Sequence, residues 1–220
     1  MTTELVSYLP FLFAGYFAMS LGLVSPGPNI LAIVGTSMSA SRRAGVMMAC
    51  GVSTGSIIWA TLAVGGVTAL MAAYAPIAFA LKVAGGLYFI WLGIKYVKAG
   101  VKKTDSFQMA ESGSSSDLQY FGRGLLIQMT NPKAILSWVA MISIVSNPGA
   151  PIWVLGLYIL GCSILAFAGH ITWAVLFSTN AALRGYDRFK RKINATLGAI
   201  FGFIGASLLV NAFKTGTKSA

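Results

Sequence analysis

The chain has 220 residues, of which 56% are hydrophobic and 10% are charged. Soluble domains carry roughly 25% charged residues, so this composition excludes an ordinary soluble protein and predicts an integral membrane protein. The formal net charge is +11, but most basic residues fall between apolar runs, which indicates membrane topology and argues against nucleic-acid binding.

Six apolar runs follow one another along the chain, and each is long enough for one spanning helix of about 20 residues. We therefore predict an all-α integral membrane fold with six transmembrane helices. A serine-rich stretch at 112–116 lies between the third and fourth runs and indicates a linker. The runs cover about residues 5–40, 45–73, 76–98, 119–147, 151–180 and 193–213. The expected parts are a first three-helix repeat at 1–98, a cytoplasmic linker at 99–118 and a second three-helix repeat at 119–220.

Proline interrupts the first and fourth runs. The first run contains Ser25-Pro26-Gly27-Pro28-Asn29, and the fourth contains Asn131-Pro132-Lys133. Each proline removes a backbone donor and restricts the residue before it. Unwound backbone at membrane depth persists only where it is buried in protein or lines a wet cavity. We therefore expect crossings one and four to be discontinuous, with their breaks forming a binding site.

Basic residues occur in alternate connections, as the positive-inside pattern requires. Arg42 and Arg43 follow the first crossing, four lysines follow the third between 95 and 103, and five basic residues lie at 184–192 after the fifth. This pattern predicts that the N-terminus is outside. Because each half has three crossings, an odd number, the two halves insert into the membrane in opposite senses, which predicts an inverted repeat. Breaks at corresponding places in two such halves are a pointer to the central site of a transporter.

Few ionisable residues lie inside the apolar runs. All five acids are in connections or near the N-terminus, which leaves Lys82, Lys133 and His170, with Arg123 at the cytoplasmic end of crossing four. Lys133 lies ten residues beyond Arg123, roughly 15 Å deep in a helix, so we expect it to face water or an anion, with snorkelling as the alternative. Snorkelling is the interpretation favoured for Lys82. His170 is able to titrate near neutral pH and is either a proton carrier or a hydrogen-bonded structural group.

The two breaks also carry uncharged amides and helix ends. Asn29 and Asn131 supply donors and acceptors, and the helix N-termini after the breaks, at Ile30 and Ala134, direct positive dipole ends toward the centre. Together with Lys133 these groups favour a carboxylate. The two cysteines, Cys50 and Cys162, are expected to be packing residues, and no metal or cofactor site is predicted.

Four motifs lie in register along most of the chain. They are Ser25-Pro26-Gly27-Pro28-Asn29, Gly51-Val52-Ser53-Thr54-Gly55, Leu81 to Gly93, and Thr130-Asn131-Pro132-Lys133-Ala134. In order and spacing they resemble the LysE/RhtB family of bacterial amino-acid exporters. The resemblance implies a multi-pass protein of the bacterial inner membrane that is not an enzyme. It also implies export of amino acids or related metabolites, driven by the proton or the membrane potential.

The chain departs from the family pattern at two positions. Where many members carry acids in crossings two and five, this sequence has Ser56 and Ser163. A neutral amino acid, such as one like homoserine or threonine, therefore fits better than a cationic one. His170 or Lys133 is the candidate for proton coupling. The expected substrate-binding residues are Pro26, Gly27, Pro28, Asn29, Ser56, Asn131, Pro132 and Lys133.

Two other functions fit parts of the sequence. The segment Gly51–Gly55 matches the serine-nucleophile pattern G-x-S-x-G, and His170 would then be the base for Ser53 in an intramembrane serine hydrolase. A passive channel is the third possibility. Glycines spaced by four, here Gly51 and Gly55 and then Gly198 and Gly202, more often permit close helix packing. The expected partners are the lipid bilayer, an amino-acid substrate and a second copy in a homodimer, with no nucleic acid.

Overall fold

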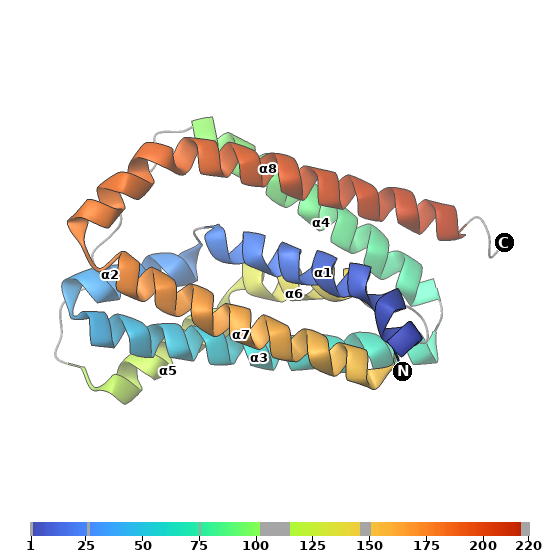
Figure 1. Ribbon diagram of the computed structural model, residues 1–220, viewed down its shortest axis with the longest axis horizontal. Coiled ribbons are helices and arrows are strands. Elements are labelled where there is room, and N and C mark those ends of the chain that lie inside the picture. Colours follow the sequence, from blue (N-terminus) through green and yellow to red (C-terminus); the bar gives the residue numbers. More distant parts are fainter. Residues whose placement is uncertain (1, 26, 75, 102–114, 146–150, 217–220) are drawn as a thin grey trace.

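The computed structural model describes residues 2–25, 27–74, 76–101, 115–145 and 151–216, which form eight helices and no strand (Figure 1). Pro26 and most of the expected linker lie outside these residues. The helices are α1 (Thr2–Val24), α2 (Pro28–Ser39), α3 (Arg42–Ala73), α4 (Pro76–Val101), α5 (Asp117–Thr130), α6 (Pro132–Val145), α7 (Ile152–Leu176) and α8 (Asn180–Gly216).

Five of the described helices are long and apolar enough to cross a membrane. The α5 and α6 helices, bent by 62° at their junction, provide a sixth crossing if they are counted as one span. The predicted all-α membrane fold is therefore confirmed. The five helical spans are Val6–Val24, Arg42–Gly66, Phe79–Ala99, Ile152–Leu176 and Arg188–Lys214.

The last connection is shorter than the sequence suggested. The apolar run at 193–213 predicts a basic connection before it, but α8 already begins at Asn180, and the basic stretch at 184–192 is helical. Arginine, lysine and alanine are good helix formers, and no proline interrupts this stretch. Hydropathy marked the residue at which α8 becomes apolar, near 193, whereas the helix itself begins at Asn180.

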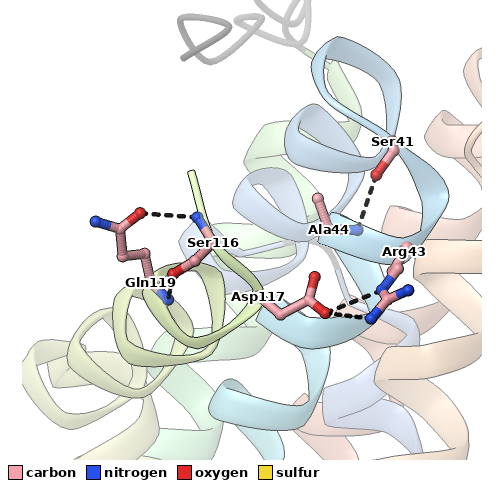
Figure 2. A network of polar contacts seen from close by, with 6 residues as sticks. All are labelled: Ser41, Arg43, Ala44, Ser116, Asp117 and Gln119. Carbon is pink, nitrogen blue, oxygen red and sulfur yellow. Dashed lines mark hydrogen bonds and ion pairs between the residues drawn. The ribbon is translucent and has the colours of Figure 1, made fainter. Parts of the chain in front are cut away.

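The connection from α2 to α3, the connection from α7 to α8 and the start of α5 are expected on the cytoplasmic side, and they lie at one end of the molecule. Figure 1 shows that end, at the left, opposite the start of α1 and the end of α8. Arg43 Nε and Nη2 donate to Asp117 Oδ2 at 2.9 and 2.6 Å, which ties the start of α3 to the start of α5 (Figure 2). Arg42 Nε donates to Ser178 Oγ at 3.2 Å beyond the end of α7.

The start of α5 has its own cap in the same region. Gln119 N donates to Ser116 Oγ, while Ser116 N donates to Gln119 Oε1 (Figure 2). This capping box satisfies two donors that an uncapped helix start would leave open. The helix therefore begins at Asp117 for a local reason, independent of the membrane.

Glycines bring two helix pairs into backbone contact. A Cβ at Gly51 of α3 would meet the carbonyl oxygen of Phe121, and one at Gly124 of α5 would meet that of Met48. In the other pair, a Cβ at Gly93 of α4 would lie 2.7 Å from the carbonyl oxygen of Gly198 in α8. Close approach of backbones through small residues is the usual packing device in membranes. Each pair takes one helix from each half of the chain.

The buried side chains form two clusters. The larger one includes Phe89, Trp138, Tyr158 and Phe201, and the smaller one surrounds Ile33 where α2 packs on α3. Many large apolar side chains on the outside remain exposed, as expected for helices that face lipid. Both cysteines are free thiols.

Candidate functional site

A cavity of about 60 Å³ lies where the break between α1 and α2 meets the break between α5 and α6. A volume of this size holds a few water molecules. None of the described residues that line it is acidic. Its polar lining consists of Asn29, Ser56, Gln128, Asn131, Lys133, Ser137 and His170. Its apolar lining includes Met19, Leu23, Phe89, Leu92, Trp138, Met141 and Phe201.

The first break separates α1, which ends at Val24, from α2, which begins at Pro28. Proline suits the first position of a helix because its missing donor would be unpaired there anyway. The carbonyls left at the end of α1 are satisfied from distant parts of the chain. Trp173 Nε1 donates to Leu23 O at 2.8 Å, and Lys133 Nζ donates to Ser25 O at 3.4 Å. The backbone at this break is thus held by side chains of α7 and α6.

The second break consists of Asn131 alone. Its side-chain Oδ1 accepts a hydrogen bond from Lys133 N at 3.0 Å, which caps the N-terminus of α6, and Pro132 takes the first helical position. Ala134 N donates to Asn131 O at 2.9 Å. Asn131 is 6% exposed. The second break is therefore stabilised by its own residues.

An amide chain connects the two breaks. Asn29 Nδ2 donates to Gln128 Oε1 at 3.2 Å, and Gln128 Nε2 donates to Ser56 Oγ at 2.7 Å. The chain runs from α2 through α5 to α3. Sequence reasoning missed Gln128, although a glutamine inside an apolar run, one turn before a break, is a signal that would have pointed to it.

Lys133 directs its ammonium toward the first break. Nζ donates to Tyr96 Oη at 2.8 Å and to Ser25 Oγ at 3.0 Å, and it lies 5.5 Å from the centre of the Tyr96 ring. The lysine lines the cavity, and its Nζ contacts α4 and the first break. Tyr88 Oη donates to Lys133 O at 3.2 Å and fixes the start of α6. No sequence signal identified Ser25 or the two tyrosines as partners of this lysine.

His170 and Ser53 lie together, as the hydrolase alternative required. Ser53 Oγ is 3.0 Å from His170 Nδ1 and also donates to Ala166 O at 3.2 Å. However, Ser53 is 0% exposed and does not line the cavity, whereas His170 does. A nucleophile must reach its substrate. The pair therefore positions the imidazole beside the cavity and does not favour a hydrolase.

Other predicted residues are dispersed. Pro28 and Pro132 are exposed, so they shape the breaks without lining the cavity, and Gly27 lies beneath the Lys133 side chain. Ser163 Oγ donates to Ile159 O on its own helix at 2.6 Å and is not part of the cavity lining. Lys82 borders a separate, mostly apolar cavity of about 620 Å³ between α1, α4, α6 and α8.

The model of the LysE type translocator family matches residues 20–212. The chain belongs to this family. The threonine efflux protein of Salmonella typhi is 30% identical over 200 residues, which cover 87% of this chain and 93% of that protein. The threonine efflux protein of Escherichia coli (strain K12) is 29% identical over 87% of this chain and 93% of its own length. No solved structure matches.

A third relative is the uncharacterized membrane protein YahN of Escherichia coli (strain K12), 27% identical over 90% of each chain. The resemblance inferred from the four motifs is thereby confirmed. As a LysE type translocator, the chain is a multi-pass membrane protein of a transporter family, and this membership supports amino-acid export.

Proposed function

We propose that this LysE type translocator exports neutral amino acids, or related small metabolites, across the bacterial cytoplasmic membrane. The observation that carries the proposal is the cavity where the two helix breaks meet, lined by amides, hydroxyls and one lysine. The threonine efflux proteins among its relatives favour a substrate like threonine or homoserine.

The polar groups suit the two ends of an amino acid. Its carboxylate pairs with Lys133 and with the N-terminal end of α6, where the helix dipole is positive. Its ammonium meets carbonyls at the first break. Ser56, at a position where an acid would favour a cationic side chain, contributes only a hydroxyl and is engaged by Gln128. The remaining wall is apolar, with Met19 and Phe89 among its members, which fits a small neutral side chain.

The proposed topology is an inverted repeat with discontinuous crossings at α1–α2 and α5–α6, and with the N-terminus outside. Two packing relations support it: α3 packs on α5, and α7 packs on α1, which are the equivalent pairs of two such halves. The arginine-bearing connections at one end of the molecule support the orientation. The homodimer stays a prediction.

The proposed mechanism is alternating access. Rocking one half of the chain against the other would separate the glycine contacts between α3 and α5 and between α4 and α8. A motion of the α4–α8 pair against the other six helices keeps both contacts. The central cavity and the larger cavity beside Lys82 both lie along the boundary between these two bodies. We therefore assign the moving boundary to that surface.

Proton coupling is assigned to Lys133 or His170, which both line the cavity. The choice is tested by replacing His170 with glutamine and measuring export at several pH values. A relay through the imidazole predicts a changed pH profile in His170→Gln. An unchanged profile removes His170 from the coupling step and leaves Lys133.

The decisive experiment uses proteoliposomes loaded with labelled L-threonine and then with a panel of neutral, acidic and basic amino acids. Export against a concentration gradient, when a proton gradient or membrane potential is imposed, distinguishes a coupled transporter from a channel. Asn29→Ala and Lys133→Ala should reduce export about tenfold or more, since a hydrogen bond to a charged group contributes about 1.5–3 kcal/mol.

Lys98→Ala is the matched control, because it removes an exposed lysine of α4 that lines neither the central cavity nor the larger one. It should export normally. Full export by both Asn29→Ala and Lys133→Ala at normal expression would overturn the assignment of the site.

A further inference from the structure

The ammonium of Lys133 lies in a ready-made binding site for a primary amine. Its three hydrogen-bond acceptors are Tyr96 Oη at 2.8 Å, Ser25 Oγ at 3.0 Å and Ser25 O at 3.4 Å. The Tyr96 ring adds its face, with 5.5 Å between Nζ and the ring centre. An ammonium has three donors and is attracted by an aromatic face, so these groups match all of its binding capacity.

This site carries no balancing negative charge. Ser25 is 0% exposed and Tyr96 is 7% exposed, and within the part of the chain that the structure describes no carboxylate contacts Lys133 Nζ. A buried ammonium is costly unless it is paired. A zwitterionic ligand would place its own ammonium in the site in place of the Lys133 ammonium. Its carboxylate would then pair with the displaced Lys133 ammonium and supply the missing negative charge.

We propose that Ser25 and Tyr96 form the ammonium subsite of the translocator, and that Lys133 fills this subsite as a tethered stand-in when no substrate is bound. An entering amino acid places its ammonium on Ser25 and Tyr96. The displaced Lys133 ammonium then pairs with the carboxylate of the same molecule. The zwitterionic nature of the ligand rests on the proposed function, whereas the subsite itself is testable without transport.

Gly27 leaves room for the exchange. A Cβ at Gly27 would lie 3.3 Å from Lys133 Nζ and 3.6 Å from Lys133 Cδ, so the lysine stem crosses the backbone where no side chain stands. The same lysine lines the central cavity. A short swing of its flexible stem therefore moves the ammonium between the subsite and the cavity. A ligand without an ammonium leaves Lys133 in place, and a ligand without a carboxylate brings two cations together.

Chemical complementation tests the subsite in the purified full-length chain. Lys133→Ala removes everything beyond Cβ, which n-propylammonium replaces in length and charge. Binding to the folded state alone raises stability, so n-propylammonium should raise the unfolding midpoint of Lys133→Ala by roughly 3–6 °C, the shift expected for about a tenfold excess over its dissociation constant. The wild type, whose subsite is filled, should not respond, and neither should the matched control Lys98→Ala.

Propanol, which lacks the charge, and tetramethylammonium, which lacks N–H donors, are the control ligands. Neither should raise the unfolding midpoint of Lys133→Ala. Equal stabilisation of all three proteins by n-propylammonium, or none, would overturn the proposal. If the midpoint shift is specific to Lys133→Ala but no amino acid is exported, the subsite stands and the proposed function fails. If export is observed without the specific shift, the proposed function stands and the subsite fails.

A second variant decides the matter if Lys133→Ala does not fold. Tyr96→Leu removes the ring and the hydroxyl but keeps Lys133, and Tyr96→Phe removes the hydroxyl alone. Tyr96→Leu weakens the hold on Lys133 in the ligand-free chain and on the ligand's ammonium in the complex alike, so it should leave binding of L-threonine nearly unchanged. Binding of 3-hydroxybutyrate, which pairs with Lys133 without refilling the subsite, should become about tenfold tighter, since one hydrogen bond to a charged group no longer has to be broken, with Tyr96→Phe intermediate. An equal change for both ligands would refute an ammonium subsite.

Discussion

The two helix breaks meet at one cavity but are stabilised in different ways. At the first break the carbonyls of Ser25 and Leu23 are satisfied by Lys133 and Trp173, which lie 108 and 150 residues away in sequence. At the second break Asn131 caps α6 from the adjoining position. The first break is therefore held by tertiary structure and the second by local structure.

Under the proposed alternating access, this difference gives the two breaks different parts in the cycle. A contact supplied by a distant side chain ends when that side chain moves or when a ligand competes for it. A cap within one turn persists as long as the helix does. We infer that the first break changes its partners during the cycle and that the second serves as the fixed side of the site.

The largest effect on stability is expected from breaking the hydrogen bonds of Gln128 to Asn29 and Ser56, which link the two breaks. Gln128→Leu leaves the Asn29 amide and the Ser56 hydroxyl without their shared partner, and each buried unpaired group costs about 1–3 kcal/mol. The variant should lower the thermal midpoint of the purified protein by roughly 5 °C or more. In a double-mutant cycle with Ser56→Ala, the two losses should be less than additive. Simple additivity would show that the amide chain does not couple α5 to α3.

The tertiary bond at the first break provides the second test. Trp173→Phe keeps an aromatic ring but removes the hydrogen bond to Leu23 O, so it should destabilise the protein by about 1–3 kcal/mol. Trp59→Phe is the matched control, because Trp59 Nε1 is buried without a hydrogen-bond partner among the described residues. Thermal unfolding should separate the two variants. Equal midpoints would mean that Trp173 does not stabilise the break.

The local cap at the second break should have a smaller effect. Asn131→Ala removes the acceptor for Lys133 N and should cost about 1 kcal/mol, whereas Asn131→Ser keeps an N-cap acceptor and should recover most of the loss. The same unfolding assay measures both. Failure of serine to recover stability would show that Asn131 acts through its contacts with the cavity and not as a cap.

The smallest effect is expected far from both breaks. Arg43→Ala removes the pair with Asp117, whose side chains are 81% and 40% exposed, and exposed pairs contribute less than about 1 kcal/mol. The difference from the wild type should shrink further at high salt. A larger, salt-independent loss would indicate that the ends of α3 and α5 depend on this pair for their position.

Local rules predicted the breaks, while tertiary contacts determined their partners. Helices begin at Pro28 and Pro132, two of the prolines that the sequence marked as helix breakers. Tyr96 and Trp173 were not predictable as partners, because an apolar run does not show which of its aromatic residues accepts from a lysine, as Tyr96 does, or donates to a carbonyl, as Trp173 does. Ser163 was linked to Ser56 by the family pattern alone, and its hydroxyl instead bonds within its own helix.

The start of α8 was misplaced for a different reason. An apolar run reports where a helix enters lipid, while a basic, proline-free stretch before it extends the same helix into water. The two boundaries coincide where a helix breaker directly precedes the apolar run, as Pro151 does before α7.

The backbone contact between α4 and α8 has a consequence for biosynthesis. Gly93 receives its counterpart Gly198 only when the final helix has left the ribosome. Until then the face of α4 that carries Gly93 lacks the helix that covers it. A polypeptide truncated before α8 would leave that face uncovered.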